Sequence, residues 1–216
     1  MLGTDLTRVL REAGHEVTPT DLPEVDITDP ASCAAAVAGH DVVVNTAAYT
    51  AVDRAESDEV TAFRINAVGP ATLARAVHAA GARMVHISTD YVFAGDGSTP
   101  YAEDAPIAPK SAYGRTKAAG EWAVRAECPQ SYIVRTAWLY GENGPNFIKT
   151  MARLAGERET VSVVADQTGQ PTSTVDLSRF IADILGAEVP FGRYHGTSEG
   201  ETTWFGFAQA VFEELG

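Results

Sequence analysis

Tyr113 and Lys117 are the two residues of this sequence whose types and spacing are best suited to proton transfer. Residues four positions apart share one face of a helix, so the phenol and the ammonium would project to the same side. A nearby cation favours the phenolate form, so we expect Lys117 to lower the pKa of Tyr113 from its ordinary value of roughly 10. Such a tyrosine can donate or accept a proton near neutral pH.

A further hydroxyl group precedes this pair. Residues 83–87 form a short apolar run that predicts a buried strand, which places Ser88 and Thr89 at its carboxyl end. Ligands of open parallel α/β sheets bind at that edge. We therefore expect Thr89 to hold a carbonyl oxygen in place. The irregular stretch between Thr89 and Tyr113 spans about two dozen residues, a length that is more often functional than idle.

Several segments carry a resemblance to a known family. They are similar to the extended short-chain dehydrogenase/reductases and, within them, to the dTDP-4-dehydrorhamnose reductase family: Ile87–Phe93, Tyr113–Glu121, Arg135–Tyr140, Asn45–Asp53 and Asp166–Thr172. The last two match that reductase family rather than the superfamily in general. The resemblance runs through almost the whole chain.

The resemblance implies an enzyme that reduces the 4-keto group of dTDP-4-dehydrorhamnose to dTDP-L-rhamnose, with NADPH or NADH as the hydride donor. It implies that Tyr113 protonates the alkoxide while Lys117 and Thr89 assist as catalytic residues. Asp90 would contact the sugar together with Thr89 and Trp138. The residues expected to bind the cofactor are Gly3, Asp21, Asp26, Ile27, Ala48, Tyr49, Thr50, Ile87, Tyr113 and Lys117.

Two of these assignments have a structural alternative. An acid at the end of a second strand accepts hydrogen bonds from a ribose and repels a 2′-phosphate, so Asp21 favours NADH, but it is equally well explained as a solvated turn residue. Trp138 follows a predicted strand and is either a core residue or a platform for a sugar or base. Asn66 interrupts an apolar helix face, and we interpret it as structural rather than catalytic.

Alternating strand and helix patterns predict an α/β fold, a doubly wound, Rossmann-like parallel sheet with part of a smaller C-terminal substrate lobe. We expect a dinucleotide-binding domain over residues 1–142 and a partial substrate lobe over residues 143–216. The expected strands are residues 15–20, 41–46, 83–87, 131–136, 160–164 and 192–197. The expected helices include residues 2–13, 30–37, 60–80, 174–185 and 203–215.

The resemblance also leads us to expect a buried strand and a glycine-rich turn upstream of Leu2, and further elements of the substrate domain downstream. The sequence is therefore expected to be a fragment that lacks its first strand and most of that turn. A missing central strand leaves unpaired backbone groups on its neighbours, so we expect low stability and low activity.

Composition restricts the partners. A net charge of −13 and a pI of about 4.7 argue against nucleic acid and anionic membranes. Cys33 and Cys128 lack metal-site spacing, so we expect free thiols, no metal and a cytoplasmic protein. A small nucleotide sugar is the expected partner, and a homodimer is left open.

Two other functions compete with the reductase assignment. A ketoreductase for another nucleotide deoxysugar would use the same catalytic residues and differ only in pocket shape. A non-catalytic protein is the alternative from another class, because the regulatory subunit of methionine adenosyltransferase resembles this family and uses the fold for interaction.

Overall fold

A computed structural model describes residues 1–187 and 189–216 and divides the chain into two compact units. The first unit comprises Met1–Thr18, Thr136–Glu188 and Gly196–Gly216, and the second comprises Pro19–Arg135 and Val189–His195. No helix in the described part of the chain is both long and apolar enough to cross a membrane.

The second unit is built on a four-stranded sheet in the order β1-β2-β3-β7. β1 runs parallel to β2, with Val42 opposite Arg83, and β3 runs parallel to β7, with Tyr132 opposite Gly192. Every residue of β3 is buried, as expected for an interior strand of a parallel sheet. The strands are β1 (Val42–Asn45), β2 (Arg83–Thr89), β3 (Ser131–Thr136) and β7 (Gly192–His195). The predicted α/β fold with a parallel sheet is confirmed.

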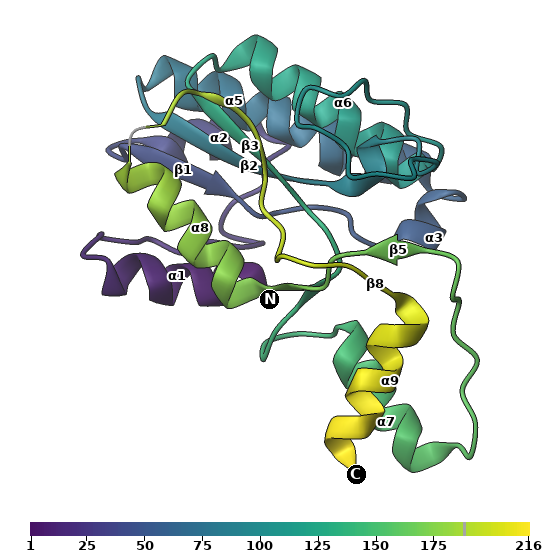
Figure 1. Cartoon of the computed structure of the whole chain (residues 1–216). Coiled ribbons are helices and arrows are strands. Elements are labelled where there is room, and N and C mark those ends of the chain that lie inside the picture. The colour runs from purple at the N-terminus through teal and green to yellow at the C-terminus, as the bar shows by residue number, and fades with distance from the viewer. Residues whose placement is uncertain (188) are drawn as a thin grey trace. The chain divides into compact units, whose positions relative to one another are not determined.

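Helices cover this sheet, and α5 packs between α2 and α6 (Figure 1). Asp29 caps α2 by accepting a hydrogen bond from the Ala31 amide, with Pro30 in the first turn, as the sequence predicts. The helical elements are α2 (Pro30–Val37), α3 (Val52–Ala55), α4 (Glu59–Phe63), the π-helix η1 (Arg64–Val68), α5 (Gly69–Ala79), the 3₁₀-helix η2 (Asp90–Val92) and α6 (Ala112–Glu127).

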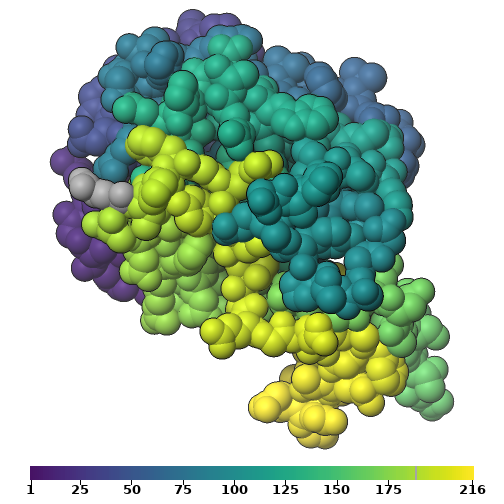
Figure 2. Space-filling view, turned by 45° about the horizontal axis from the view of Figure 1, so that its top comes forward, coloured from purple at the N-terminus to yellow at the C-terminus, as the bar shows by residue number. Residues whose placement is uncertain are grey.

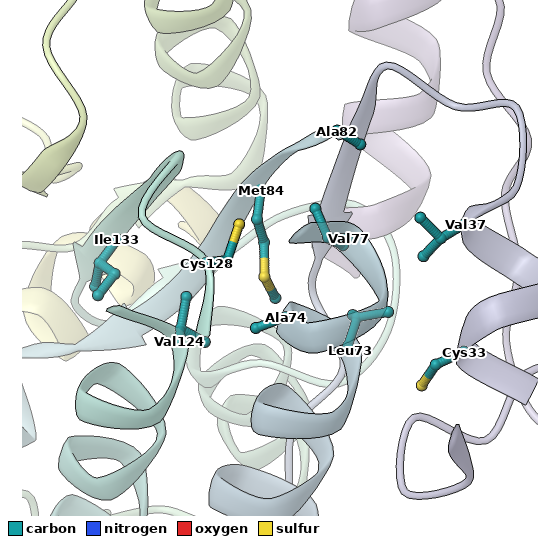
Figure 3. Packing of buried hydrophobic residues seen from close by; sticks show 10 residues of the cluster. All are labelled: Cys33, Val37, Leu73, Ala74, Val77, Ala82, Met84, Val124, Cys128 and Ile133. Carbon is teal, nitrogen blue, oxygen red and sulfur yellow. The ribbon is translucent and has the colours of Figure 1, made fainter. Parts of the chain in front are cut away.

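The core of this unit lies between the helices and the sheet. Figure 3 shows Met84 of β2 pointing toward Ala74 and Val77 of α5, with Val124 of α6 nearby. Both cysteines belong to this cluster and are free thiols. These contacts pack α6 against β2, and α6 carries Tyr113 and Lys117.

The described residues of the first unit form two helix pairs and four two-residue strands. α1 packs against α8, where the buried Asp5 carboxylate accepts a 2.6 Å hydrogen bond from the Thr174 hydroxyl. α7 packs against α9, and Figure 2 shows the yellow C-terminal segment beside green residues. The elements are α1 (Leu2–Glu12), β4 (Leu139–Tyr140), α7 (Phe147–Glu157), β5 (Thr168–Gly169), β6 (Thr172–Ser173), α8 (Thr174–Gly186), β8 (Thr202–Thr203) and α9 (Trp204–Leu215).

Three sequence predictions about elements are wrong. Residues 15–20 form no strand, because no neighbouring strand among the described residues pairs with them and their side chains are mostly exposed. Residues 160–164 form no strand for the same reason: they lie along α7 and α9, where Val161 and Val163 pack against the cluster of Met151, Ala208 and Val211. The helix predicted over residues 60–80 is interrupted by the π-helix η1.

Candidate active site

Tyr113 and Lys117, the predicted catalytic pair, lie in the first two turns of α6. Ser111 caps this helix through the Gly114 amide at 3.0 Å, and the Glu56 carboxylate accepts a 2.7 Å hydrogen bond from the Ala112 amide. A carboxylate at a helix N-terminus satisfies free amides and complements the helix dipole. The start of α6, and with it Tyr113, is therefore held from two sides.

Lys117 is fully buried and ties α6 to the end of β2. Its Nζ donates a 2.6 Å hydrogen bond to the Ile87 carbonyl, and its side chain is among the largest that are almost wholly buried. Burial lowers the pKa of Lys117 to about 8, while the nearby Glu121 carboxylate opposes this shift. Lys117 thus changes its charge close to neutral pH.

Thr89, Asp90 and Tyr113 lie together at the carboxyl end of β2. The Thr89 hydroxyl donates to the Asp90 carboxylate at 2.9 Å and accepts from the Tyr91 amide at 3.2 Å. The Tyr91 and Tyr113 rings meet edge to face with centroids 5.6 Å apart. The sequence-predicted hydroxyl pair therefore shares one edge of the sheet with a carboxylate.

The protonation of Tyr113 differs from the sequence prediction. Burial raises the pKa of Tyr113, the Asp90 carboxylate raises it further, and the contact with the Thr89 hydroxyl opposes the rise. Lys117 does not lower this pKa, because its ammonium is turned to the Ile87 carbonyl. The expected lowering by Lys117 is wrong for this structure, and Tyr113 is a protonated acid at neutral pH.

Asp90 is also shifted toward its neutral form. Burial raises the pKa of this carboxyl, and the hydrogen bond from Thr89 partly opposes the shift. The single Thr89 hydroxyl proton is engaged by Asp90, so the Thr89 side chain has to rotate before it can donate to a ligand. In this structure the Thr89 hydroxyl therefore donates to Asp90.

Sequence reasoning assigned no role to Glu121 and Arg135, which form a buried ion pair behind these residues. The Arg135 Nη2 lies 2.7 Å from the Glu121 Oε2, and the two side chains are 1% and 2% exposed. Ser88 donates a 2.6 Å hydrogen bond to the same carboxylate. Glu121 lies four residues after Lys117, so the helical spacing was a signal for the same face.

Asn66 holds the backbone that follows β1. Its side chain accepts from the Tyr49 amide at 2.8 Å and donates to the Tyr49 carbonyl at 3.0 Å and to the Thr116 hydroxyl at 3.1 Å. Asn66 lies in the π-helix η1, a type of distortion that often occurs at functional sites. The structural role predicted for Asn66 is consistent with these bonds.

The segment Ala48–Thr50 follows β1. Ala48 and Tyr49 are partly exposed, and Thr50 is exposed. The Tyr49 ring packs with Tyr113 around a cluster of buried alanines. The Tyr49 hydroxyl donates to Asp58 at 3.3 Å. These predicted cofactor residues therefore lie in the same unit as Lys117, and Tyr49 lies beside Tyr113.

Asp21 and Asp26 are exposed and make local turns. Asp21 accepts from the Leu22 amide at 2.8 Å, and Asp26 accepts from the amide and hydroxyl of Thr28, both at 2.8 Å. These bonds lower the pKa of Asp26. Ile27 packs against the core cluster. Asp21 ends no strand, so the strand-end argument for its ribose contact is lost.

Gly3 and Trp138 belong to the first unit. Gly3 lies inside α1, and its carbonyl accepts from Thr7 at 2.8 Å. Trp138 has a φ of 47°, which is unusual for a residue with a large side chain. Its ring stacks on Trp204 with centroids 3.7 Å apart. One face of Trp138 is therefore covered by another aromatic ring.

The whole chain matches a protein-family model. The match, to the family described as RmlD substrate binding domain, spans residues 1–216. A dTDP-4-dehydrorhamnose reductase from Streptomyces griseus is 49% identical over 223 residues, which cover 100% of this chain and 73% of that protein. The chain belongs to the dTDP-4-dehydrorhamnose reductase family. A member from Mycobacterium tuberculosis is 44% identical, with 100% of this chain and 72% of that protein covered.

Solved structures of family members share the fold over nearly the whole chain. A dTDP-4-dehydrorhamnose reductase from Clostridium acetobutylicum gives a TM-score of 0.95 at 42% identity, with 99% of this chain and 76% of that chain covered. One from Bacillus anthracis, solved in complex with NADP, gives the same TM-score at 41% identity and the same coverage.

The residues of the dTDP-4-dehydrorhamnose reductase site fit a nicotinamide cofactor beside Tyr113. Lys117 has three N–H donors, and its recorded partner among the described residues is the Ile87 carbonyl. The remaining donors of a buried ammonium suit the hydroxyls of a ribose. Ala48 and Thr50 are small, which leaves room for a dinucleotide backbone at the end of β1.

Proposed function

We propose that the protein reduces the 4-keto group of dTDP-4-dehydrorhamnose to give dTDP-L-rhamnose, with NADPH or NADH. The cofactor supplies a hydride to the keto carbon when it is bound. Tyr113 donates its proton to the keto oxygen, which would otherwise become an alkoxide far more basic than a phenolate. Because the pKa of Tyr113 is raised, this residue carries its proton throughout the neutral range.

The neighbouring residues orient the reacting groups. Thr89 rotates from Asp90 to the keto oxygen and holds it near the Tyr113 phenol. Lys117 holds the nicotinamide ribose with the donors that Ile87 leaves free. Asp90 and Trp138 contact the sugar. The expected rate acceleration comes from holding the hydride donor, the keto carbon and the acid in one geometry.

One observation carries the proposal. Thr89, Tyr113 and Lys117 lie around the carboxyl end of β2, in a chain 49% identical to the Streptomyces griseus reductase. The Bacillus anthracis neighbour in complex with NADP supports a nicotinamide cofactor. These residues supply an acid, a carbonyl ligand and a ribose ligand, which are the groups that reduction of a ketone requires.

The proposal is tested by following NADPH oxidation with dTDP-4-dehydrorhamnose. Turnover by the wild-type chain that is lost in Tyr113→Phe, with NADPH still bound, would support the assignment. NADPH binding without turnover on any keto sugar would favour the non-catalytic alternative. Running NADH in parallel determines the cofactor preference.

A second substrate is supported by two relatives. A probable dTDP-4,6-dihydroxy-2-methyloxan-3-one 4-ketoreductase from Streptomyces antibioticus is 46% identical, and a dTDP-4-keto-6-deoxy-D-glucose reductase from Streptomyces niveus is 48% identical. We therefore include a dTDP-4-keto-6-deoxyglucose in the assay. A higher kcat/KM for that sugar would move the assignment to a ketoreductase for another nucleotide deoxysugar.

We propose that residues 1–142 bind the dinucleotide and that residues 143–216 contribute to the substrate lobe. The two buried free thiols support a cytoplasmic protein. A homodimer is proposed as well, and light scattering coupled to gel filtration tests it.

A further inference from the structure

The buried Ser88–Glu121–Arg135 cluster lies next to the proposed catalytic residues, because Ser88 precedes Thr89 and Glu121 lies one helical turn after Lys117. The Glu121 Oε1 accepts from the Ser88 hydroxyl at 2.6 Å and from the Arg135 Nε at 2.9 Å. Its Oε2 accepts from the Arg135 Nη2 at 2.7 Å. One carboxylate thus joins α6, β2 and β3 at a single point.

The cluster is fixed by further contacts. Arg135 also donates to the Glu103 carbonyl at 3.0 Å and stands over the Phe93 ring with its Cζ 4.9 Å from the centroid. Bidentate contact to a carboxylate leaves little freedom to either side chain. Because Ser88 precedes Thr89, this rigid carboxylate determines where the end of β2 lies relative to α6.

The same carboxylate stands one helical turn beyond Lys117. Glu121 on α6 and His86 on β2 are ionisable groups near Lys117, and Arg135 on β3 is paired with Glu121. Asp90 and Tyr91 on η2 are ionisable groups near Tyr113. Burial holds the pKa of His86 well below its usual value, so this residue is neutral. The Glu121 carboxylate is the group that favours the charged form of Lys117.

We propose that Glu121 is a positioning residue, which sets the Thr89 strand end against α6 through Ser88 and keeps the buried Lys117 in its ammonium form. Arg135 acts through Glu121 by holding that carboxylate in one orientation. This proposal rests on the proposed function of the site for its effect on turnover. Its effect on Lys117 does not depend on turnover.

The experiment uses the three lysines of the chain, Lys110, Lys117 and Lys149. Protein with ¹³C-labelled lysine is titrated by NMR, and Lys117→Arg identifies the Lys117 signal by its absence. In the wild type, this signal should titrate near pH 8. In Glu121→Gln it should titrate at a lower pH than in the wild type.

Two matched variants separate this role from a merely structural one. Glu127→Gln, at the end of α6, breaks an exposed pair with Arg75 of α5, so it should leave the Lys117 titration unchanged. Ser88→Ala removes the link to Thr89 and keeps the ion pair. It should lower kcat about tenfold, with the NADPH dissociation constant and the Lys117 titration unchanged.

The outcomes distinguish the two proposals. An unchanged Lys117 titration in Glu121→Gln, or full turnover in Ser88→Ala, would overturn the role of Glu121. If Glu121→Gln does not fold, the double variant Glu121→Gln, Arg135→Gln removes both charges and repeats the titration. Lack of turnover in the wild type, together with the expected lysine shifts, would overturn the proposed function and leave the Lys117 part of the inference intact.

Discussion

The Lys117 ammonium donates a 2.6 Å hydrogen bond to the Ile87 carbonyl, which joins the catalytic helix to the strand that carries Thr89. The backbone of β2 thereby holds a buried cation at the same edge where Thr89 presents its hydroxyl. This arrangement directs the Lys117 ammonium to the strand backbone, and the pKa of Tyr113 is raised by burial and by the Asp90 carboxylate.

Tyr113→Phe should lower kcat by about 10²- to 10⁴-fold, the range that general acid catalysis contributes. The phenyl ring keeps the edge-to-face contact with Tyr91, so folding and NADPH binding should persist. Single-turnover kinetics with saturating NADPH measure the chemical step directly. Tyr91→Phe, which keeps the same ring contact, is the control. Comparable rates for the wild type and Tyr113→Phe would remove Tyr113 from the mechanism.

Activity should fall as the pH rises through about 8, because Lys117 loses its proton near this pH. Burial lowers the pKa of this base, so the protonated form that donates hydrogen bonds is complete below that value and lost above it. The measurement is a profile of kcat/KM from about pH 6 to about pH 10, a range that covers the folded pKa of Lys117 and approaches the ordinary lysine pKa.

Lys117→Arg provides the control for this profile, because arginine stays protonated across the same range. Its activity should be low, since the larger guanidinium does not fit the place of the ammonium, yet the decline above pH 8 should disappear. A decline that persists unchanged in this variant would mean that another group causes the loss of activity above pH 8.

Asn66→Ala should weaken NADPH binding by about tenfold, because it leaves the amide and the carbonyl of Tyr49 without their partner. The segment after β1 would then lose its fixed geometry. Fluorescence titration gives the dissociation constant. Thr116→Val removes just one Asn66 contact and leaves Tyr49 held, so its dissociation constant should match the wild type. Equal weakening in both variants would point to a general loss of packing.

Gly120→Ala should destabilise the fold by about 1–3 kcal/mol, the usual cost of overpacking. A Cβ at this position would stand 2.1 Å from the Asn66 carbonyl oxygen, so α6 or η1 would have to move. Gly156→Ala on α7 meets nothing within 4 Å and should be neutral or stabilising by about 0.5–1 kcal/mol. Urea unfolding of both variants gives the comparison, and equal stabilities would contradict the close approach of α6.

Trp138→Ala should raise the KM for the nucleotide sugar about 5- to 10-fold, in line with the energy of a single aromatic contact, and leave NADPH binding unchanged. Trp122→Ala is the matched control, because Trp122 is 61% exposed on α6. An unchanged KM in Trp138→Ala would support the alternative that Trp138 is a core residue stacked on Trp204.

The sequence by itself determined the α/β fold, the strand that ends in Ser88 and Thr89, and the helix that carries Tyr113 and Lys117. These features follow from local periodicity and from the four-residue spacing of a helix, which depend on neighbouring residues alone. The family resemblance was readable for the same reason, since its motifs lie in short continuous segments.

The tertiary structure decided what no local pattern contains. The strand expected at residues 15–20 is absent, because a strand requires a hydrogen-bonded partner. The pKa of Tyr113 rises rather than falls, because burial and Asp90 act on it while Lys117 bonds to Ile87. The Glu121–Arg135 pair emerged only in the folded chain, because ion pairing across elements depends on distances that the sequence does not specify.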